Sequence, residues 1–301
     1  MASYTISHQA AWTKRTWRLY KAALLFRYRS MGTPQALEAC GLLRETTQSE
    51  CLNRSTRTSS VRPKCFDDKD LERVIECLDT SKSSCSKILQ QWLLHGVTFG
   101  LRPHEWAQTE IVYLRSADLT PDGPAAAGIW ERPRPFLRVK NSKGTNGRSH
   151  GAYRHLELMD FSSERVVNLE MFLETMRDAA EDGQFERLMR QCTDVLYRIN
   201  RGLHPKDKTR WIHLYSMRHR VSSNAKAQMS QREVGALMGH KTDRTATEHY
   251  GKRRSAKGGL EIKPIALEVS RVQAKKGHPQ STPSRTPDAS PHFHPRSTHV
   301  K

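Results

Sequence analysis

Apolar residues recur at helical spacing over most of the chain from residue 66 onward. The clearest case runs from Phe185 to Ile199, where Leu188, Cys192 and Val195 follow at steps of three or four residues and so share one helix face. The same period predicts further helices over 68–78, 84–99, 166–176, 214–228, 232–238 and 245–250. We therefore expect this part of the chain to be mainly helical.

Two short runs, 136–139 and 153–158, have the composition of strands instead. Between them lies KNSKGTNGRSHG, which is rich in the Gly, Asn and Ser residues that favour turns. The sequence thus predicts a β-hairpin with a strongly basic tip. The expected fold class is α+β, mainly α with a small antiparallel sheet.

The N-terminal residues predict a smaller helical region. Residues 12–28 have the pattern of an amphipathic helix with a basic outer face. Its expected apolar stripe consists of Leu19, Ala22, Ala23 and Phe26. A second helix is expected over 33–43, because the Thr-Pro pair at its start combines a good N-cap with a proline at the first helical position.

Composition changes along the chain mark the expected boundaries. Polar residues without periodicity follow the N-terminal helices, and the last forty residues are rich in Pro, Ser, Thr and His. We therefore divide the chain into a short helical region (1–52), a linker (53–65), a larger domain (66–259) and a basic, largely disordered tail (260–301).

Positive charge is concentrated at the two ends. The 301 residues contain 50 Lys and Arg against 31 Asp and Glu, a formal net charge of +19. The first 60 residues contain nine basic and three acidic side chains, and the last 51 contain eleven and three. Basic arms of this kind are typical of proteins that follow a polyanion, so we expect a nucleic-acid partner.

Several classes of protein are not expected. The chain has no run of about 18 apolar residues, and its first twenty residues lack an apolar segment, so neither a membrane span nor a secretory signal is predicted. The six cysteines show neither Cys-x-x-Cys spacing nor a zinc-finger pattern with histidine. These features are typical of a protein of the reducing cytoplasm with no metal and no cofactor.

Four short motifs contain groups suited to phosphate chemistry. In chain order they are GLRPHEW with Arg102 and Glu105, the hairpin tip with Lys143, YSMRH with Tyr215 and Arg218, and MGHKTDRTATEHYGKRR with His240 and Tyr250. A guanidinium donates paired hydrogen bonds to phosphate oxygens, so the two arginines are candidates for neutralising charge on a phosphate under attack. The last tyrosine is the candidate nucleophile.

Read in this order, the motifs resemble the tyrosine recombinase (phage integrase) family. That family has an Arg in a GLR-x-x-E box, a Lys on a β-hairpin, a His-x-x-Arg box, a Gly-His box and then a tyrosine nucleophile. The resemblance covers roughly residues 66–255, and the N-terminal region is compatible with a short version of the family's DNA-clamping, core-binding domain. It implies a site-specific recombinase or integrase of a mobile element, which cuts and rejoins DNA through a 3′-phosphotyrosine intermediate.

The resemblance also implies a role for each side chain. Lys143 would protonate the departing 5′ oxygen, with Lys140 as its rival, and His240 would donate a hydrogen bond to a phosphate oxygen. Glu105 is expected to support an active-site arginine rather than to react.

Two features depart from the family's pattern. Tyr215 stands where a histidine is usual, and a phenol near neutral pH serves as a hydrogen-bond donor rather than as a proton acceptor. The interval from His240 to Tyr250 is also one residue longer than is usual.

Double-stranded DNA carrying attachment sites is the expected partner, bound by a homo-oligomer, most simply a tetramer, in the cytoplasm at the nucleoid. The expected phosphate contacts are Arg138, Lys140, Arg148, Arg154, Lys252, Arg253 and Arg254. An apolar run at 262–269 is either a segment passed to a neighbouring subunit or a part of its own domain. Two alternatives stay open, a type IB topoisomerase and a catalytically silent DNA-binding protein of the same fold.

Overall fold

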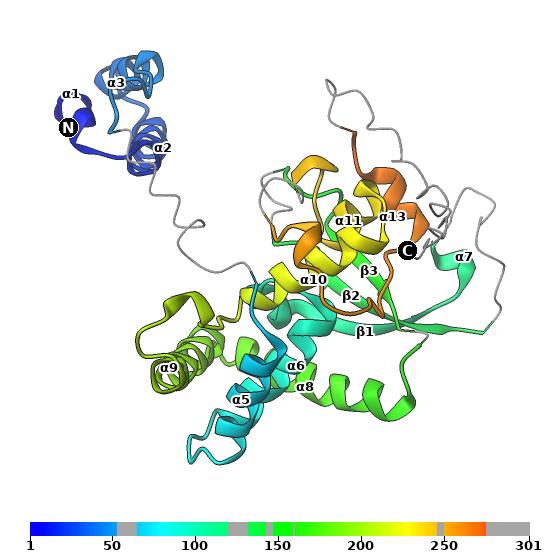
Figure 1. Cartoon of the computed structure of the whole chain (residues 1–301). Helices are drawn as coiled ribbons and strands as arrows, with labels where there is room; N and C mark the ends of the chain where they lie inside the picture. The colour runs from blue at the N-terminus through cyan, green and yellow to red at the C-terminus, as the bar shows by residue number, and fades with distance from the viewer. Residues whose placement is uncertain (53–64, 120–131, 143–146, 159, 246–249, 275–301) are drawn as a thin grey trace, which may run out of the picture. The chain divides into compact units, whose positions relative to one another are not determined.

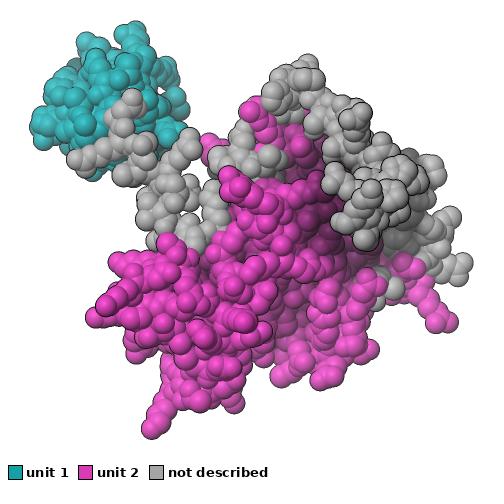
Figure 2. Space-filling view, viewed as in Figure 1, with its two compact units in different colours: residues 1–62 teal, residues 63–301 magenta. Residues whose placement is uncertain are grey.

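The computed structural model describes residues 1–52, 65–119, 132–142, 147–158, 160–245 and 250–274. The chain divides into two compact units, Met1–Arg62 and Pro63–Lys301, coloured teal and magenta in Figure 2. The predicted linker lies almost wholly outside the described residues, as does most of the helix predicted over 245–250.

The first unit is helical. Its elements are α1 (Ala2–Ser7), the 3₁₀ turn η1 (Gln9–Ala11), α2 (Lys14–Met31) and α3 (Pro34–Glu45). The α2 helix ends at Gly32, whose left-handed φ of +63° is easiest for glycine, and Thr33 then caps α3 by accepting a hydrogen bond from the amide of Ala36. Both predicted helices are therefore present.

The predicted apolar stripe of α2 is wrong. Leu19 and Phe26 are 70% and 78% exposed, whereas Trp17 is fully buried against α3 with Leu43. A helix of this composition offers two apolar faces at the same spacing. The face with Trp17 is the one that is buried, because burial of this large side chain removes more apolar surface from water than burial of the Leu19 face would.

The second unit contains the remaining elements, shown in Figure 1. Before the sheet and within it these are α5 (Asp68–Asp79), α6 (Ser86–Phe99), η2 (Pro103–Gln108), β1 (Thr109–Leu114), α7 (Ser116–Leu119), β2 (Arg134–Lys140) and β3 (Tyr153–Glu157). After the sheet follow α8 (Ser163–Glu181), α9 (Phe185–Leu203), η4 (Lys208–Arg210), α10 (Ser216–Gln228), α11 (Gln231–Leu237), η5 (Arg253–Ser255) and α13 (Ala266–Arg271). None of the helices in these ranges has both the length and the apolar composition needed to cross a bilayer.

The sheet has three antiparallel strands in the order β1-β2-β3. Thr109 pairs with Val139 at one end of the β1–β2 ladder and Lys140 pairs with Tyr153 in the β2–β3 ladder. The prediction of a mainly helical chain with a small antiparallel sheet is thus confirmed. The strand β1 was not predicted.

Aromatic side chains form the centre of the core. Trp106 packs edge-on against Phe99 and Phe172, with ring centroids 6.3 and 5.2 Å apart, which joins η2 to α6 and α8. Leu89 and Trp92 of α6 are buried in the same cluster. This packing fixes the end of α6, from which the first site residues follow.

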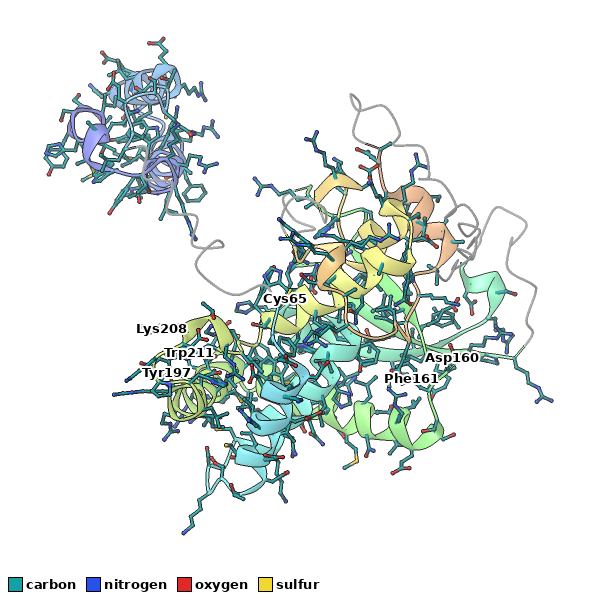
Figure 3. All side chains as sticks on the ribbon, viewed as in Figure 1. Cys65, Asp160, Phe161, Tyr197, Lys208 and Trp211 are labelled. Atoms are coloured by element: carbon teal, nitrogen blue, oxygen red, sulfur yellow. The ribbon has the colours of Figure 1, made fainter. Side chains whose placement is uncertain are left out.

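The chain between α9 and α10 is held by polar and aromatic contacts. The buried side chain of Asn200 donates to the carbonyl of Ile212 (2.7 Å) and accepts from its amide (2.8 Å). Trp211 packs edge-on against Tyr197, and Lys208 lies over the Trp211 ring (Figure 3). These contacts fix the backbone shortly before α10.

Residues 260–274 are packed into the core of the second unit, which corrects the predicted start of the tail at 260. Ile262, Ile265 and Val272 are buried, and Pro264 forms an isolated bridge with Leu156 of β3. The run at 262–269 therefore packs on its own domain here, because its apolar side chains complete that core. The rest of the predicted tail, 275–301, lies outside the described residues.

Candidate active site

Arg102 follows the tight end of α6. Gly100 has a φ of +61°, which terminates the helix, and the buried Leu101 then leads into η2. The side chain of Glu105 accepts a hydrogen bond from the Arg102 backbone amide at 2.9 Å. Arg102 thus begins a turn whose geometry is set by its own neighbour three residues on.

Arg218 lies in α10, which packs closely against α6. A Cβ at Gly96 would lie 2.8 Å from Met217 Cγ, and one at Gly100 would lie 2.6 Å from Val221 Cβ, so both glycines are needed for this approach. The fully buried Arg218 guanidinium donates to the Gly100 carbonyl at 2.9 Å. The glycine of the GLR motif therefore has two roles, close packing and acceptance of this hydrogen bond.

His240 follows α11 through a helix-ending motif. The amide of His240 donates to the Gly235 carbonyl and the amide of Gly239 to that of Ala236, which is the Schellman arrangement. Gly239 has a φ of +66°. At the other end of the helix, Ser230 and Glu233 form a capping box.

Tyr250 brings these segments together. Its side chain is 5% exposed, and its hydroxyl lies 3.2 Å from Arg218 Nε, 3.2 Å from the Tyr215 hydroxyl and 3.4 Å from His240 Nε2. The Tyr250 ring also lies near the ring of His219, with centroids 5.5 Å apart. Predicted site residues from the YSMRH motif, the Gly-His motif and the tyrosine segment therefore cluster around one hydroxyl group.

Glu105 connects the arginines of this cluster. Its carboxylate accepts from Arg102 Nη1 at 2.5 Å and from Arg154 Nη2 at 2.7 Å, and it lies 3.8 Å from Arg218 Nη1. The Ser142 hydroxyl also lies 3.2 Å away. Burial alone raises the pKa of Glu105, but the three guanidiniums hold that pKa well below its ordinary value. Glu105 is thus an ionised, buried support for the arginines.

The structure corrects the prediction that Arg154 contacts DNA. Arg154 is 0% exposed, and besides Glu105 it binds Asn141 Oδ1. Asn141 in turn donates to the Gly151 carbonyl at 2.9 Å. Because both Nη atoms of its fully buried guanidinium bind side-chain oxygens, Arg154 links the GLR turn to the base of the hairpin and does not present its charge at the surface.

Arg102 retains free hydrogen-bonding capacity. Its Nε and Nη2 atoms are buried and have no hydrogen-bond partner among the described residues, although the residue is only 6% exposed. Burial by itself disfavours the charged form, but the carboxylate of Glu105 raises the pKa of Arg102 above its ordinary value. A charged guanidinium with two unpaired nitrogen atoms, which carry three N–H groups, is suited to an anion with two oxygens.

The surroundings of the two tyrosine hydroxyls shift their pKa values in opposite directions. Burial opposes the ionisation of Tyr250, but the charges of Arg218 and Arg102, helped by hydrogen bonds from Tyr215 and Arg218, lower the pKa of Tyr250 to about 7. Burial and the neighbouring Tyr250 raise the pKa of Tyr215 to about 12. Tyr215 is therefore the proton donor in this pair and Tyr250 the acceptor. This is the asymmetry that a nucleophile and its supporting donor require.

The other predicted residues are not brought to Tyr250 by any described contact. Lys143 lies outside the described residues, and Lys140 is exposed at the end of β2. Arg138 is half-buried and paired with Glu110 at 2.6 Å. The remaining predicted DNA contacts, Arg148, Lys252, Arg253 and Arg254, are exposed.

Comparisons with known proteins identify no relative. The sequence matches no protein-family model, and no curated protein or solved structure is detectably similar to it. Within the described ranges, no three His, Cys, Asp or Glu side chains gather closely enough to hold a metal ion.

Proposed function

We propose that this protein is a DNA strand-breaking and rejoining enzyme of the tyrosine recombinase type, which integrates or excises a mobile element at a specific site. One observation supports the proposal above all. The Tyr250 hydroxyl lies within 3.4 Å of Arg218, Tyr215 and His240, and the charge of Arg102 also acts on it. Three of these groups contact one oxygen atom, and the charge of Arg102, which stands 148 residues before Tyr250 in the chain, acts on the same hydroxyl.

The proposed reaction uses the chemistry of this cluster of side chains. The Tyr250 phenolate attacks the phosphorus of a DNA phosphodiester, a bond forms between the phenolic oxygen and phosphorus, and the bond to the 5′ oxygen breaks. The phosphate remains attached to the 3′ end as a phosphotyrosine. The departing 5′ oxygen takes up a proton, which we assign by resemblance to Lys143, with Lys140 as the alternative donor. Reversal of the same steps with a second 5′ hydroxyl rejoins the strand.

Guanidiniums would stabilise the crowded phosphate during attack. A guanidinium carries five N–H groups. Among the described residues Arg218 uses three of them, on Gly100, Met238 and Tyr250, which leaves two. The remaining N–H groups of Arg218 and the two unpaired nitrogens of Arg102 would donate hydrogen bonds to the non-bridging phosphate oxygens. These hydrogen bonds would stabilise the negative charge that develops there. His240 would add a further donor.

Binding of the duplex is proposed to use exposed basic residues. Lys252, Arg253 and Arg254 follow the nucleophile directly, and Arg148 lies beyond the hairpin tip. The helical unit at the N-terminus would clamp the duplex, and a tetramer would act on paired sites, as the resemblance implies. Contacts of this kind should make the affinity fall steeply with salt.

The proposal is tested by trapping a covalent intermediate. A pool of nicked duplexes with random sequence around the nick is incubated with the protein, and adducts are separated on a denaturing gel and sequenced. We expect an adduct that maps to Tyr250 by peptide mass spectrometry, disappears in Tyr250→Phe and carries one enriched DNA sequence.

Each alternative has a distinct outcome in this assay. Adducts without an enriched sequence, together with relaxation of supercoiled plasmid, would instead identify a type IB topoisomerase. Binding of the duplexes without any adduct would refute the enzymatic proposal and favour a silent DNA-binding protein.

A further inference from the structure

The residues that follow Tyr250 lie along α10, the helix that carries Arg218. Contacts between α10 and η5 are extensive. Side chains of α10 bind this segment at two places, the first at Gly251 and the second at 257–259.

The first place is a close fit around Gly251. His219, Ser223 and Lys226 follow each other at steps of four and three residues, so they share one face of α10. A Cβ at Gly251 would lie 2.1 Å from Ser223 Oγ and 2.8 Å from the His219 carbonyl, so a larger residue does not fit. Lys226 Nζ donates to the Gly251 carbonyl at 2.7 Å.

The second place holds the other end of the segment. Asn224 Oδ1 accepts from the backbone amide of Lys257 at 2.9 Å, and Asn224 Nδ2 donates to the Gly259 carbonyl at 3.4 Å. One turn further along α10, Gln228 Nε2 donates to the Gly258 carbonyl at 3.3 Å. The amide side chains of Asn224 and Gln228 thus hold the backbone of residues 257–259 by uncharged hydrogen bonds.

We propose that the docking of residues 251–259 on α10 delivers Tyr250 to Arg218 of the same subunit, with Gly251 and Lys226 as positioning residues. The inference rests on the proposed function of Tyr250 as nucleophile. A tyrosine side chain has two rotatable bonds, each with few preferred values. Once the backbone at Gly251 is fixed against α10, the hydroxyl can reach the 3.2 Å contact with Arg218 Nε only from a narrow range of conformations.

Ionisation of Tyr250 gives a test that does not depend on DNA. The phenolate absorbance is titrated in the intact protein, and the titration of the same variant carrying Tyr250→Phe is subtracted. We expect Gly251→Ala and Lys226→Met to raise the pKa of Tyr250 from about 7 toward the ordinary tyrosine value of about 10. Lys226→Arg keeps a cationic donor and should keep the low pKa.

Matched controls separate positioning from general damage. In Gly202→Ala on α9 the new Cβ would meet no described atom within 4 Å outside the local helix backbone, and Lys87→Met changes an exposed lysine of α6. Neither should change the titration. Circular dichroism verifies that each variant is folded. If Gly251→Ala does not fold, Lys226→Met decides the question. A folded Lys226→Met protein with an unchanged Tyr250 pKa would overturn the inference.

A mixing experiment tests delivery within one subunit. Arg218→Ala and Tyr250→Phe proteins are each expected to form no adduct on the nicked duplex pool, and neither should their mixture. Adducts restored in the mixture would show a tyrosine reaching a neighbouring subunit and would refute the inference. In the wild-type background, Gly251→Ala and Lys226→Met should slow adduct formation on the order of 100-fold, the effect of a displacement of about 1 Å. If the wild type itself forms no adduct, the proposed function fails, while the titration still decides the positioning.

Discussion

Removal of the Tyr250 hydroxyl should change how stability depends on pH. The pKa of Tyr250 is lowered to about 7 in the folded protein, against about 10 for an ordinary tyrosine that models the unfolded chain. A group with a lowered folded pKa contributes stability above its unfolded pKa and loses it as pH falls through the folded pKa. The free energy of unfolding of the wild type should therefore rise, relative to Tyr250→Phe, as pH increases from about 7 to about 10.

The size of the effect follows from the shift. Three pKa units at about 1.4 kcal/mol each give at most about 4 kcal/mol over the whole window. The slope between those limits should approach about 1.4 kcal/mol per pH unit, and below pH 7 the difference between the two proteins should be constant. The window must end at about pH 10, because the raised pKa of Tyr215, about 12, acts with the opposite sign above it.

Urea denaturation followed by circular dichroism measures this difference at a series of pH values. The control is Tyr197→Phe, because this hydroxyl is on an exposed side chain of α9 whose ring packs on Trp211. The control should track the wild type at every pH. A difference between wild type and Tyr250→Phe that stays constant from about pH 6 to 10 would refute the claim that the arginines stabilise a phenolate.

Three further predictions concern the support of the site and its surface. Glu105→Gln removes the carboxylate shared by buried guanidiniums, so urea denaturation should show a loss of about 3–5 kcal/mol, and a loss near zero would contradict the network. Gly239→Ala places a Cβ 2.3 Å from a side-chain oxygen at a φ of +66° and should destabilise by about 1–3 kcal/mol, whereas Gly41→Ala, in an open position on α3, should stabilise by up to about 1 kcal/mol. Lys252→Gln should make the decrease of log affinity with log salt concentration less steep by about 0.9, as measured by fluorescence anisotropy with a duplex of random sequence. An unchanged slope would exclude a phosphate contact at Lys252.

The sequence predicted elements whose pattern had one interpretation. In α9 the apolar residues define one face, so both the helix and its buried side were predictable. In α2 the face of Leu19 and the face of Trp17 have the same period, and only packing against α3 selects between them. The missed strand β1 did carry a signal, since Ile111, Val112 and Tyr113 are residues that favour strands.

The site was predictable where its residues belong to short motifs. Arg102, Arg218 and His240 each stand beside a glycine or in a compact box, and the structure places them as one constellation with Tyr250. The role of Arg154 was missed because its partner Glu105 lies 49 residues away. One available signal was the alternation of side chains along a strand. Arg154 stands two residues before the apolar Leu156 and therefore lies on the same, buried face of the sheet.

The contacts of Gly251 and Lys226 with α10 carried no comparable signal. They depend on how closely a loop approaches a helix, and a single sequence does not encode that distance in any local pattern.

The sharing of the Glu105 carboxylate by three arginines has a consequence for the stability of the protein without a bound anion. Three guanidiniums converge on the carboxylate of Glu105, so the cations outnumber the anion that supports them. Their mutual repulsion is a stored cost that a bound phosphodiester would relieve. A simple oxyanion such as sulfate that binds the folded protein at these guanidiniums should therefore raise its melting temperature.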